Sequence, residues 1–273
     1  MVIRRASGST LIYIVLTLLG LFFLMPMIWL VLASITPHAT LEVQFPTHPA
    51  LTNFITIIGD GLVARPFMNS FILSISTMFL VIILSGLAAY PLSRRQFRLK
   101  AYVMYCILFA SALPVLALVT PLYAMYNTLR LTDTMQGCVL FFTASSLPFS
   151  IWLMKNFLDG VPIELEEAAW IDGASMLASF RHIMLPLAAP GVAVVGVWSF
   201  IGAWANFFIP LIILQSQDLF PASIHIYNFF GSYGEVDYGQ LTAYAILYAL
   251  PCVILYTLVS RFFVKGMSGG LKG

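Results

Sequence analysis

Charged residues are scarce in this chain. Only 9% of its 273 residues are Asp, Glu, Lys or Arg, whereas a soluble domain carries about 25%. The hydrophobic share is 60%, so a soluble globular protein is excluded. The net charge of +2 is small, and no cluster of basic residues alternates with aromatics in the sequence. We therefore expect no nucleic-acid partner.

Cysteine is also rare. The chain has three, Cys106, Cys138 and Cys252, and all of them lie in apolar segments. Their number is odd and their spacing fits no metal-binding motif. We therefore predict three small buried hydrophobic residues and no metal site.

The sequence lacks the common motifs of catalysis and of ATP binding. It has no H-E-x-x-H and no G-x-S-x-G, so we expect no catalytic residues. Its glycine-rich C-terminus is no phosphate-binding loop, because Lys272 is followed by Gly273 rather than by Ser or Thr. We therefore expect that the chain does not hydrolyse ATP and needs no cofactor of its own.

Long apolar runs are abundant instead. Each is at least about 20 residues, enough for a helix to cross a bilayer, and backbone groups in lipid must bond within their own helix. The charge-free runs are Ala6–Leu41, Pro66–Ser93, Ala101–Leu129, Thr134–Met154, Ile183–Gln217 and Tyr238–Ser260. Within them we expect spans at Thr10–Ile35, Phe67–Leu92, Ala101–Tyr123, Met135–Trp152, Leu185–Leu214 and Gln240–Ser260. The prediction is an all-α polytopic membrane protein with six transmembrane helices.

The basic residues set the orientation of these spans. With both termini in the cytoplasm, only Arg65 and Arg130 of the 13 Lys and Arg residues fall outside. This bias satisfies the positive-inside rule. The first apolar run is too long for a signal peptide, so we expect it to be retained. No charged residue lies inside an expected span, which argues against proton coupling.

The loops between the spans differ in character. Two external loops, about Thr36–Pro66 and Gln215–Gly239, are either surfaces for a soluble partner or ordinary connectors. The internal loop Arg94–Lys100 is basic and suits lipid headgroups. The internal loop Lys155–His182 is acidic and carries Glu164, Glu166, Glu167 and Asp172.

The acidic loop predicts a helical hairpin. Pro162 suits a first helical position, and acidic residues in the first turns favour a helix over Glu164–Ile171. Gly173 suits a chain reversal with positive φ, and Ser175 can cap a second helix, Met176–His182. We expect Pro186 to begin the fifth span. The hairpin either lies on the membrane surface or binds another protein. Its acidic character favours the protein, since an anionic leaflet repels it.

The same loop resembles a known family. Glu167-Ala168-Ala169, Gly173 and Ile183-Met184-Leu185-Pro186 match the pattern E-A-A-x3-G-x9-I-x-L-P without a gap. This pattern is that of the EAA loop (here residues 160–186) of binding-protein-dependent ABC transporter permeases of the type I importer fold. In that family the loop is a cytoplasmic coupling helix, seated in a cleft of the ATP-binding subunit. The resemblance assigns ATPase coupling to Glu167, Ala168, Ala169, Asp172, Gly173, Leu185 and Pro186.

Other segments resemble the carbohydrate uptake subfamily. Ala88–Arg94 resembles a span end shared across the family, and Phe200–Phe207 resembles a fifth-span signature of sugar permeases. The tail Lys265–Gly273 resembles that of the smaller six-span maltose-type subunit, and implies contact of Gly269, Gly270 and Lys272 with the ATPase dimer. The departure is Ala205-Asn206, where sugar permeases often have Asn and an acidic residue. It leaves the exact substrate open.

The resemblance also implies an organisation and a set of partners. It divides the chain into an N-terminal helix and external loop (1–66), a permease core of five spans (67–264) and a cytoplasmic tail (265–273). The implied partners are a second permease subunit, two ATP-binding subunits that hold ATP and Mg, an external substrate-binding protein and the lipid of a prokaryotic inner membrane.

The translocation path is less well marked. Asn69, Ser70, Trp204 and Asn206 are candidate pathway residues, although polar groups in spans also serve as hydrogen-bonding contacts between helices. A glycerol-phosphate importer of the same class is one alternative. A non-transporting membrane scaffold that binds a cytoplasmic partner is the other.

Overall fold

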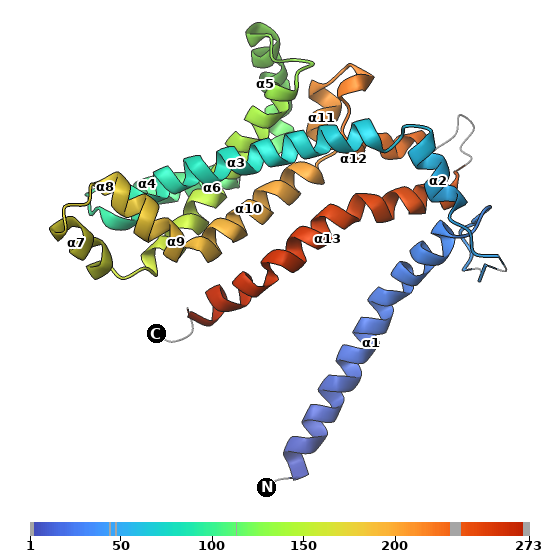
Figure 1. Ribbon diagram of the computed structural model, residues 1–273, viewed down its shortest axis with the longest axis horizontal. Helices are drawn as coiled ribbons and strands as arrows, with labels where there is room; N and C mark the ends of the chain where they lie inside the picture. Colours follow the sequence, from blue (N-terminus) through green and yellow to red (C-terminus); the bar gives the residue numbers. More distant parts are fainter. Residues whose placement is uncertain (1–2, 44, 47, 113, 230–235, 270–273) are drawn as a thin grey trace. The chain divides into compact units, whose positions relative to one another are not determined.

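The computed structural model describes residues 3–43, 45–46, 48–112, 114–229 and 236–269, and the regular elements in these ranges are helices (Figure 1). This agrees with the predicted all-α class. The chain divides into two units, one of Met1–Ala64 with His225–Leu250 and one of Arg65–Ile224 with Pro251–Gly273. The second unit holds the predicted EAA loop.

In the first unit, the end of the first helix is hydrogen-bonded to a short helix that lies outside the expected spans. The long helix α1 (Ile3–Ser34) is followed by α2 (Thr52–Gly59), and α13 (Tyr238–Gly269) begins in the same unit. Asn53 of α2 donates side-chain hydrogen bonds to the carbonyls of Ser34 and Thr36, both at 3.0 Å. These bonds satisfy carbonyl groups that the end of α1 leaves without a helical partner.

The second unit is built on three long or central helices: α3 (Ala64–Arg94), α6 (Met135–Asp159) and α10 (Ala189–Trp204). Helix α6 contacts both α10 and α4 (Lys100–Ser111). The remaining elements of this unit are α5 (Val115–Leu129), α7 (Glu164–Ile171), α8 (Met176–Ser179), η1 (Phe180–Met184), α9 (Leu185–Leu187), α11 (Phe208–Ile213), η2 (Gln217–Leu219) and α12 (Ala222–His225). The short helix η3 (Ile226–Phe229) belongs to the first unit.

Four of the six expected spans correspond to single helices of sufficient length and hydropathy. Within the described ranges, these are Ile12–Ser34, Ala64–Arg94, Met135–Asp159 and Tyr238–Ser260. A fifth span is counted only if the pair Met176–Leu187 and Ala189–Trp204, bent by 78°, is taken as one. Apolar helices of this length are the form that bilayers accept. The chain therefore crosses the membrane several times, as its hydropathy predicts.

The expected third span, Ala101–Tyr123, is corrected to two helices. Helices α4 and α5 are about 18 and 22 Å long at 1.5 Å per residue, and each is shorter than the bilayer core of about 30 Å. Pro114 stands at the start of α5 with an extended backbone (φ −68, ψ 116). Its ring excludes the helical hydrogen bond that would have continued α4.

The expected fifth span, Leu185–Leu214, is also corrected. The helix breaks at Ala188 and again at Ala205, before α11 begins at Phe208. Pro186 and Pro190 each remove a backbone N–H near the first break, which explains why the chain bends there. At the second break, the side-chain oxygen of Asn206 accepts a hydrogen bond of 3.0 Å from the Ile209 N–H.

A close approach between α6 and α10 holds the unit together. A Cβ built on Gly191 would lie 2.4 Å from Cγ of Phe157 and 2.5 Å from its Cβ. Real side chains do not tolerate such distances, so only glycine fits at this crossing. Small residues at helix crossings allow the tight packing on which membrane helices depend.

Replacing Gly191 with alanine is therefore expected to destabilise the protein by about 1–3 kcal/mol, the usual cost of overpacking. We expect a lower Tm and a lower yield of purified protein in detergent. The matched control is Gly202→Ala on the same helix, where an added Cβ meets nothing within 4 Å. Equal melting temperatures for the two variants would contradict the packing argument.

A hydrogen-bonded aspartate connects two loops at the opposite end of this unit from the EAA loop. Asp133 has φ 54, and its carboxylate accepts hydrogen bonds from the backbone N–H groups of Gln215 and Ser216, both at 2.9 Å, and from the Ser216 hydroxyl. These bonds, that of the Ser216 side chain foremost, lower the pKa of Asp133. The loop before α6 is thereby attached to the segment after α11.

Candidate functional site

The EAA loop forms the helical hairpin that the sequence predicts. Its first helix, α7, runs from Glu164 to Ile171 with three glutamates in its first turn, where the helix dipole favours negative charge. The helix ends in two reversed hydrogen bonds, from Gly173 N to Trp170 O (3.0 Å) and from Ala174 N to Ala169 O (2.9 Å). This pairing is the Schellman motif, which satisfies the last carbonyls of a helix.

Gly173 makes that ending possible. Its φ is +86°, in the region that residues with a Cβ rarely occupy. A Cβ at this position would meet nothing within 4 Å. The requirement for glycine is therefore conformational rather than steric, as the sequence predicts.

The second arm of the hairpin departs from the prediction in one respect. Ser175 caps α8 as expected, with its hydroxyl accepting a bond of 3.2 Å from the Ala178 N–H. The predicted helix Met176–His182, however, is α-helical only to Ser179. It continues as a π-helix over Phe180–Met184, a form that often marks functional segments. Pro186 cannot supply an N–H to the regular pattern, which accounts for the change of form.

Pro162 also lies outside its predicted place. The first helix begins at Glu164 with Ile163 as its N-cap residue, so Pro162 precedes the helix rather than opening it. Because the residue before a proline is pushed toward extended geometry, the proline marks the end of the connection from α6 and not the first turn of α7.

The hairpin rests on an apolar cluster of the second unit. Phe180 and Met184 of the loop are buried together with Tyr90 of α3 and with Met154 and Leu158 of α6. The rings of Tyr90 and Phe180 lie 4.9 Å apart. This contact fixes the second arm of the loop to the ends of two long helices.

A buried ion pair fixes the first arm. The side chain of Glu166 is 0% exposed, and its carboxylate accepts a bond of 2.8 Å from Nε of Arg94, which is 10% exposed. The Tyr90 hydroxyl donates to the second carboxylate oxygen. A buried carboxylate is tolerated when a charge and a hydrogen bond both satisfy it.

Several large apolar side chains of the hairpin are exposed. Ile171 is 86% exposed and Leu177 is 67% exposed, and Leu165 and Trp170 are exposed as well. Large exposed apolar side chains on a loop mark a candidate protein-binding surface. We call these four residues the apolar face of the EAA loop.

The structure places the predicted coupling residues around this face. Glu167, Ala168 and Asp172 are exposed, Ala169 is half-buried, and all four lie on α7 or at its end. Leu185 and Pro186 stand in α9, at the far end of the hairpin. The predicted coupling residues thus lie partly on the exposed helix α7 and partly at the start of the fifth expected span.

Sequence reasoning did not single out Glu166 or Arg94. Glu164, Glu166 and Glu167 are equivalent in the first turn of α7 when only the sequence is known. The neighbouring helix α3 decides which of the three is buried. The basic residues at the end of α3 and after it were the one available signal, since a buried glutamate needs a cation nearby.

The candidate pathway residues are engaged within the second unit. Asn69 donates hydrogen bonds to the carbonyls of Asp218 (2.9 Å) and Phe220 (3.1 Å), and the Ser70 hydroxyl accepts one of 2.9 Å from Ala222. Trp204 is buried against Phe67, Phe71 and Phe200. Contact between helices is thus one role of these side chains, and their contact with a solute stays a prediction.

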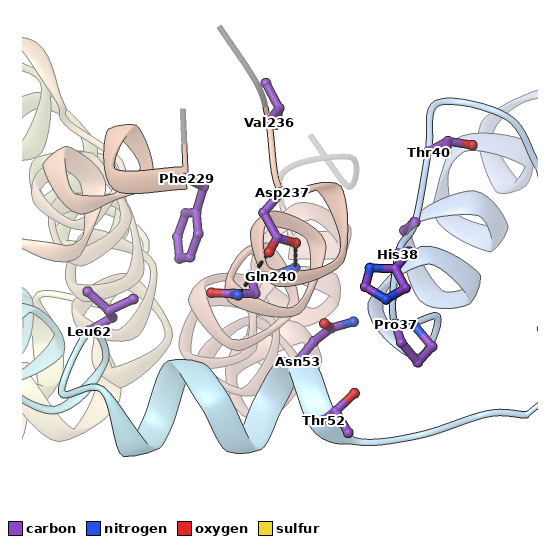
Figure 2. A pocket seen from close by; sticks show the side chains of 11 residues that line it. Pro37, His38, Thr40, Thr52, Asn53, Leu62, Phe229, Val236, Asp237 and Gln240 are labelled. Carbon is purple, nitrogen blue, oxygen red and sulfur yellow. Dashed lines mark hydrogen bonds between the residues drawn. The ribbon is translucent and has the colours of Figure 1, made fainter. Parts of the chain in front are cut away.

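The predicted external loops meet in the first unit around a cavity of about 800 Å³. Figure 2 shows His38 and Thr40 on one side of it and Phe229 on another, with Asn53, Asp237 and Gln240 between them. The Asp237 carboxylate accepts bonds from the backbone and side chain of Gln240 (3.0 and 2.8 Å). A cavity of this size with a mixed polar and apolar lining can hold a small ligand or a loop of a partner.

The predicted C-terminal tail is partly helical. Helix α13 continues through Gly269, so residues 265–269 extend the last helix rather than forming a separate loop. Gly270 and Lys272 lie outside the described residues. Contact of the tail with an ATPase dimer therefore stays a prediction.

Comparisons with known proteins agree with the resemblance. Residues 81–269 match the family described as binding-protein-dependent transport system inner membrane component. A probable ABC transporter permease protein of Pyrococcus horikoshii is 32% identical over 262 residues, which are 92% of this chain and 93% of the relative. The trehalose transport system permease protein of Mycobacterium tuberculosis is 30% identical over 261 residues, which are 94% and 95% of the two chains.

A solved structure shares the fold. A bacterial ABC transporter involved in the import of the acidic polysaccharide alginate contains a chain with a TM-score of 0.82 and 20% identity. The match covers 95% of this chain and 98% of that chain. The fold described above is therefore shared with that chain.

Proposed function

Because the chain belongs to the family of binding-protein-dependent transport system inner membrane components, we propose that it carries a sugar, oligosaccharide or polyol across a prokaryotic inner membrane. The chain is a permease of the ABC transporter class and a multi-pass membrane protein. The similarity to a trehalose permease over 94% of the chain supports a carbohydrate. A glycerol phosphate remains the alternative substrate.

The observation that carries the mechanism is the EAA loop, which combines an exposed apolar face with buried attachment to α3 and α6. An ATPase subunit that binds this face moves a rigid body rather than a loose loop. Closure of two ATP-bound subunits would then shift the membrane helices by rigid-body motion. In this mechanism the permease binds no ATP or Mg, and the ATPase subunits hold both.

Four further partners complete the proposed transporter: a second permease subunit, two ATPase subunits and an external binding protein. The many exposed apolar residues of α1 and of the outer side of α3 suit lipid and the second permease. The excess of Lys and Arg on one side supports cytoplasmic termini. With that orientation, the cavity between His38 and Asp237 opens on the external side, where a binding protein would deliver its solute.

The first test is ATP hydrolysis by the assembled transporter. The chain is co-expressed with the transporter subunits encoded beside it, and ATPase activity is measured with the binding protein over a panel of sugars, polyols and glycerol phosphate. We expect stimulation by one class of carbohydrate and none by the unloaded binding protein.

Two outcomes would contradict parts of this proposal. Stimulation by glycerol phosphate alone would replace the carbohydrate with a phosphate ester. A chain that purifies without an ATPase and shows no solute-dependent hydrolysis would favour a membrane scaffold that binds another cytoplasmic protein.

A further inference from the structure

One guanidinium group contacts both arms of the EAA loop. Nε of Arg94 donates to the Glu166 carboxylate on the first arm at 2.8 Å. Its Nη2 donates to the Val161 carbonyl, just before that arm, at 2.8 Å and contacts the Met184 sulfur on the second arm at 3.2 Å. The start of the loop, at Val161 and Glu166, and its end, at Met184, therefore meet at the last residue of α3.

The contacts of Arg94 depend on the shape of its guanidinium group as well as on its charge. A guanidinium is planar and presents several donors in fixed directions, whereas a lysine ammonium is a point charge on a flexible stem. The side chain of Arg94 is 10% exposed and that of Glu166 is 0% exposed. Such a buried network is rigid when all of its members are satisfied.

The cluster has more connections than charge neutralisation requires. The Nε contact alone would compensate Glu166, and Tyr90 already donates to its second oxygen. The contacts to Val161 and Met184 serve no ion pair. They connect α3 to both ends of the hairpin, whose centre carries the exposed apolar face.

We propose that Arg94 is a positioning residue for energy coupling, which transmits movement of the EAA loop to helix α3. The proposal rests on the proposed function, since it needs an ATPase subunit to push on the loop. Arg94 touches neither solute nor nucleotide in this mechanism. Its contribution is the transfer of motion, so its loss lowers the solute transported per ATP hydrolysed.

The test separates this role from simple compensation of a buried charge. Arg94→Met alone would leave the buried Glu166 without a positive charge beside it and would disturb folding. Two other variants avoid that fault. Arg94→Lys keeps the charge but loses the planar fork, and the double variant Arg94→Met/Glu166→Gln removes both charges at nearly constant volume, a change that buried pairs often tolerate.

Each variant is assembled with its partner subunits in proteoliposomes, and solute uptake and ATP hydrolysis are measured together. We expect both variants to assemble and to hydrolyse ATP, with about 2- to 30-fold less solute transported per ATP, the range seen when coupling networks are altered. Arg98→Met, an exposed arginine in the same cytoplasmic loop, is the matched control and should keep the unmodified ratio.

If either assembled variant transports as much solute per ATP hydrolysed as the unmodified transporter, the proposal is overturned. Failure of both variants to assemble would also overturn it, because Arg94 would then serve folding rather than coupling. Failure of the proposed function itself is recognised separately, since the unmodified complex would then show no solute-stimulated ATP hydrolysis.

Discussion

Replacing Gly173 with valine is expected to lower solute uptake by about 5- to 30-fold while the chain remains inserted and assembled. The φ of +86° disfavours a residue with a Cβ by roughly 1–2 kcal/mol, and β-branched residues are the least tolerant there. A shift of that size changes the population ratio of two loop conformations by about this factor. Because a Cβ at Gly173 meets nothing within 4 Å, the substitution strains the turn without disturbing a core.

The matched control for this prediction is Gly173→Asn. Asparagine enters the left-handed region several times more readily than other residues with a side chain, so we expect uptake close to that of the unmodified chain. Uptake is measured in proteoliposomes beside the amount of co-purified ATPase. Equal losses in the valine and asparagine variants would show that the turn geometry of Gly173 is not what coupling requires.

The hairpin was predictable because its signals are local. Acidic residues at a helix start, a glycine where φ turns positive and a serine that caps the next helix each act within one turn of chain. The structure therefore confirms α7 at Glu164–Ile171, the reversal at Gly173 and the cap at Ser175. None of these needs a distant partner.

The continuity of the spans was harder to predict. Hydropathy reports which segments prefer lipid and not whether one helix runs through them. Pro114, Pro186 and Pro190 stand at or near breaks in the third and fifth expected spans. Other prolines, such as Pro91 and Pro148, lie inside unbroken helices. A proline in the sequence therefore does not by itself show whether a helix is interrupted.

Which of the three glutamates of α7 is buried also depends on tertiary structure. The resemblance assigns coupling to Glu167, which is exposed, while Glu166 is the one buried against Arg94. The two roles are compatible. One glutamate faces outward, where a partner subunit would bind, and its neighbour attaches the helix to the permease.

The largest effect on assembly is expected from charges placed on the apolar face. Ile171 and Leu177 are the most exposed large apolar residues of the EAA loop, at 86% and 67%. If an ATPase subunit covers them, the double variant Ile171→Glu/Leu177→Glu places two carboxylates in a desolvated interface. Loss of a buried hot-spot residue costs about 2 kcal/mol or more, so we expect binding of the ATPase subunit to weaken by at least about 30-fold.

Co-purification of the ATPase subunit through a tag on this chain measures that loss directly. The control is Phe97→Glu, the same kind of change at an exposed apolar residue of the loop after α3, and it should leave co-purification intact. We expect insertion to be preserved in both variants, because the predicted topology places both loops outside the membrane. An ATPase that remains bound to the double variant would mean that the apolar face is not its binding surface. The exposed carboxylates of Glu167 and Asp172 would then be the groups to test for that contact.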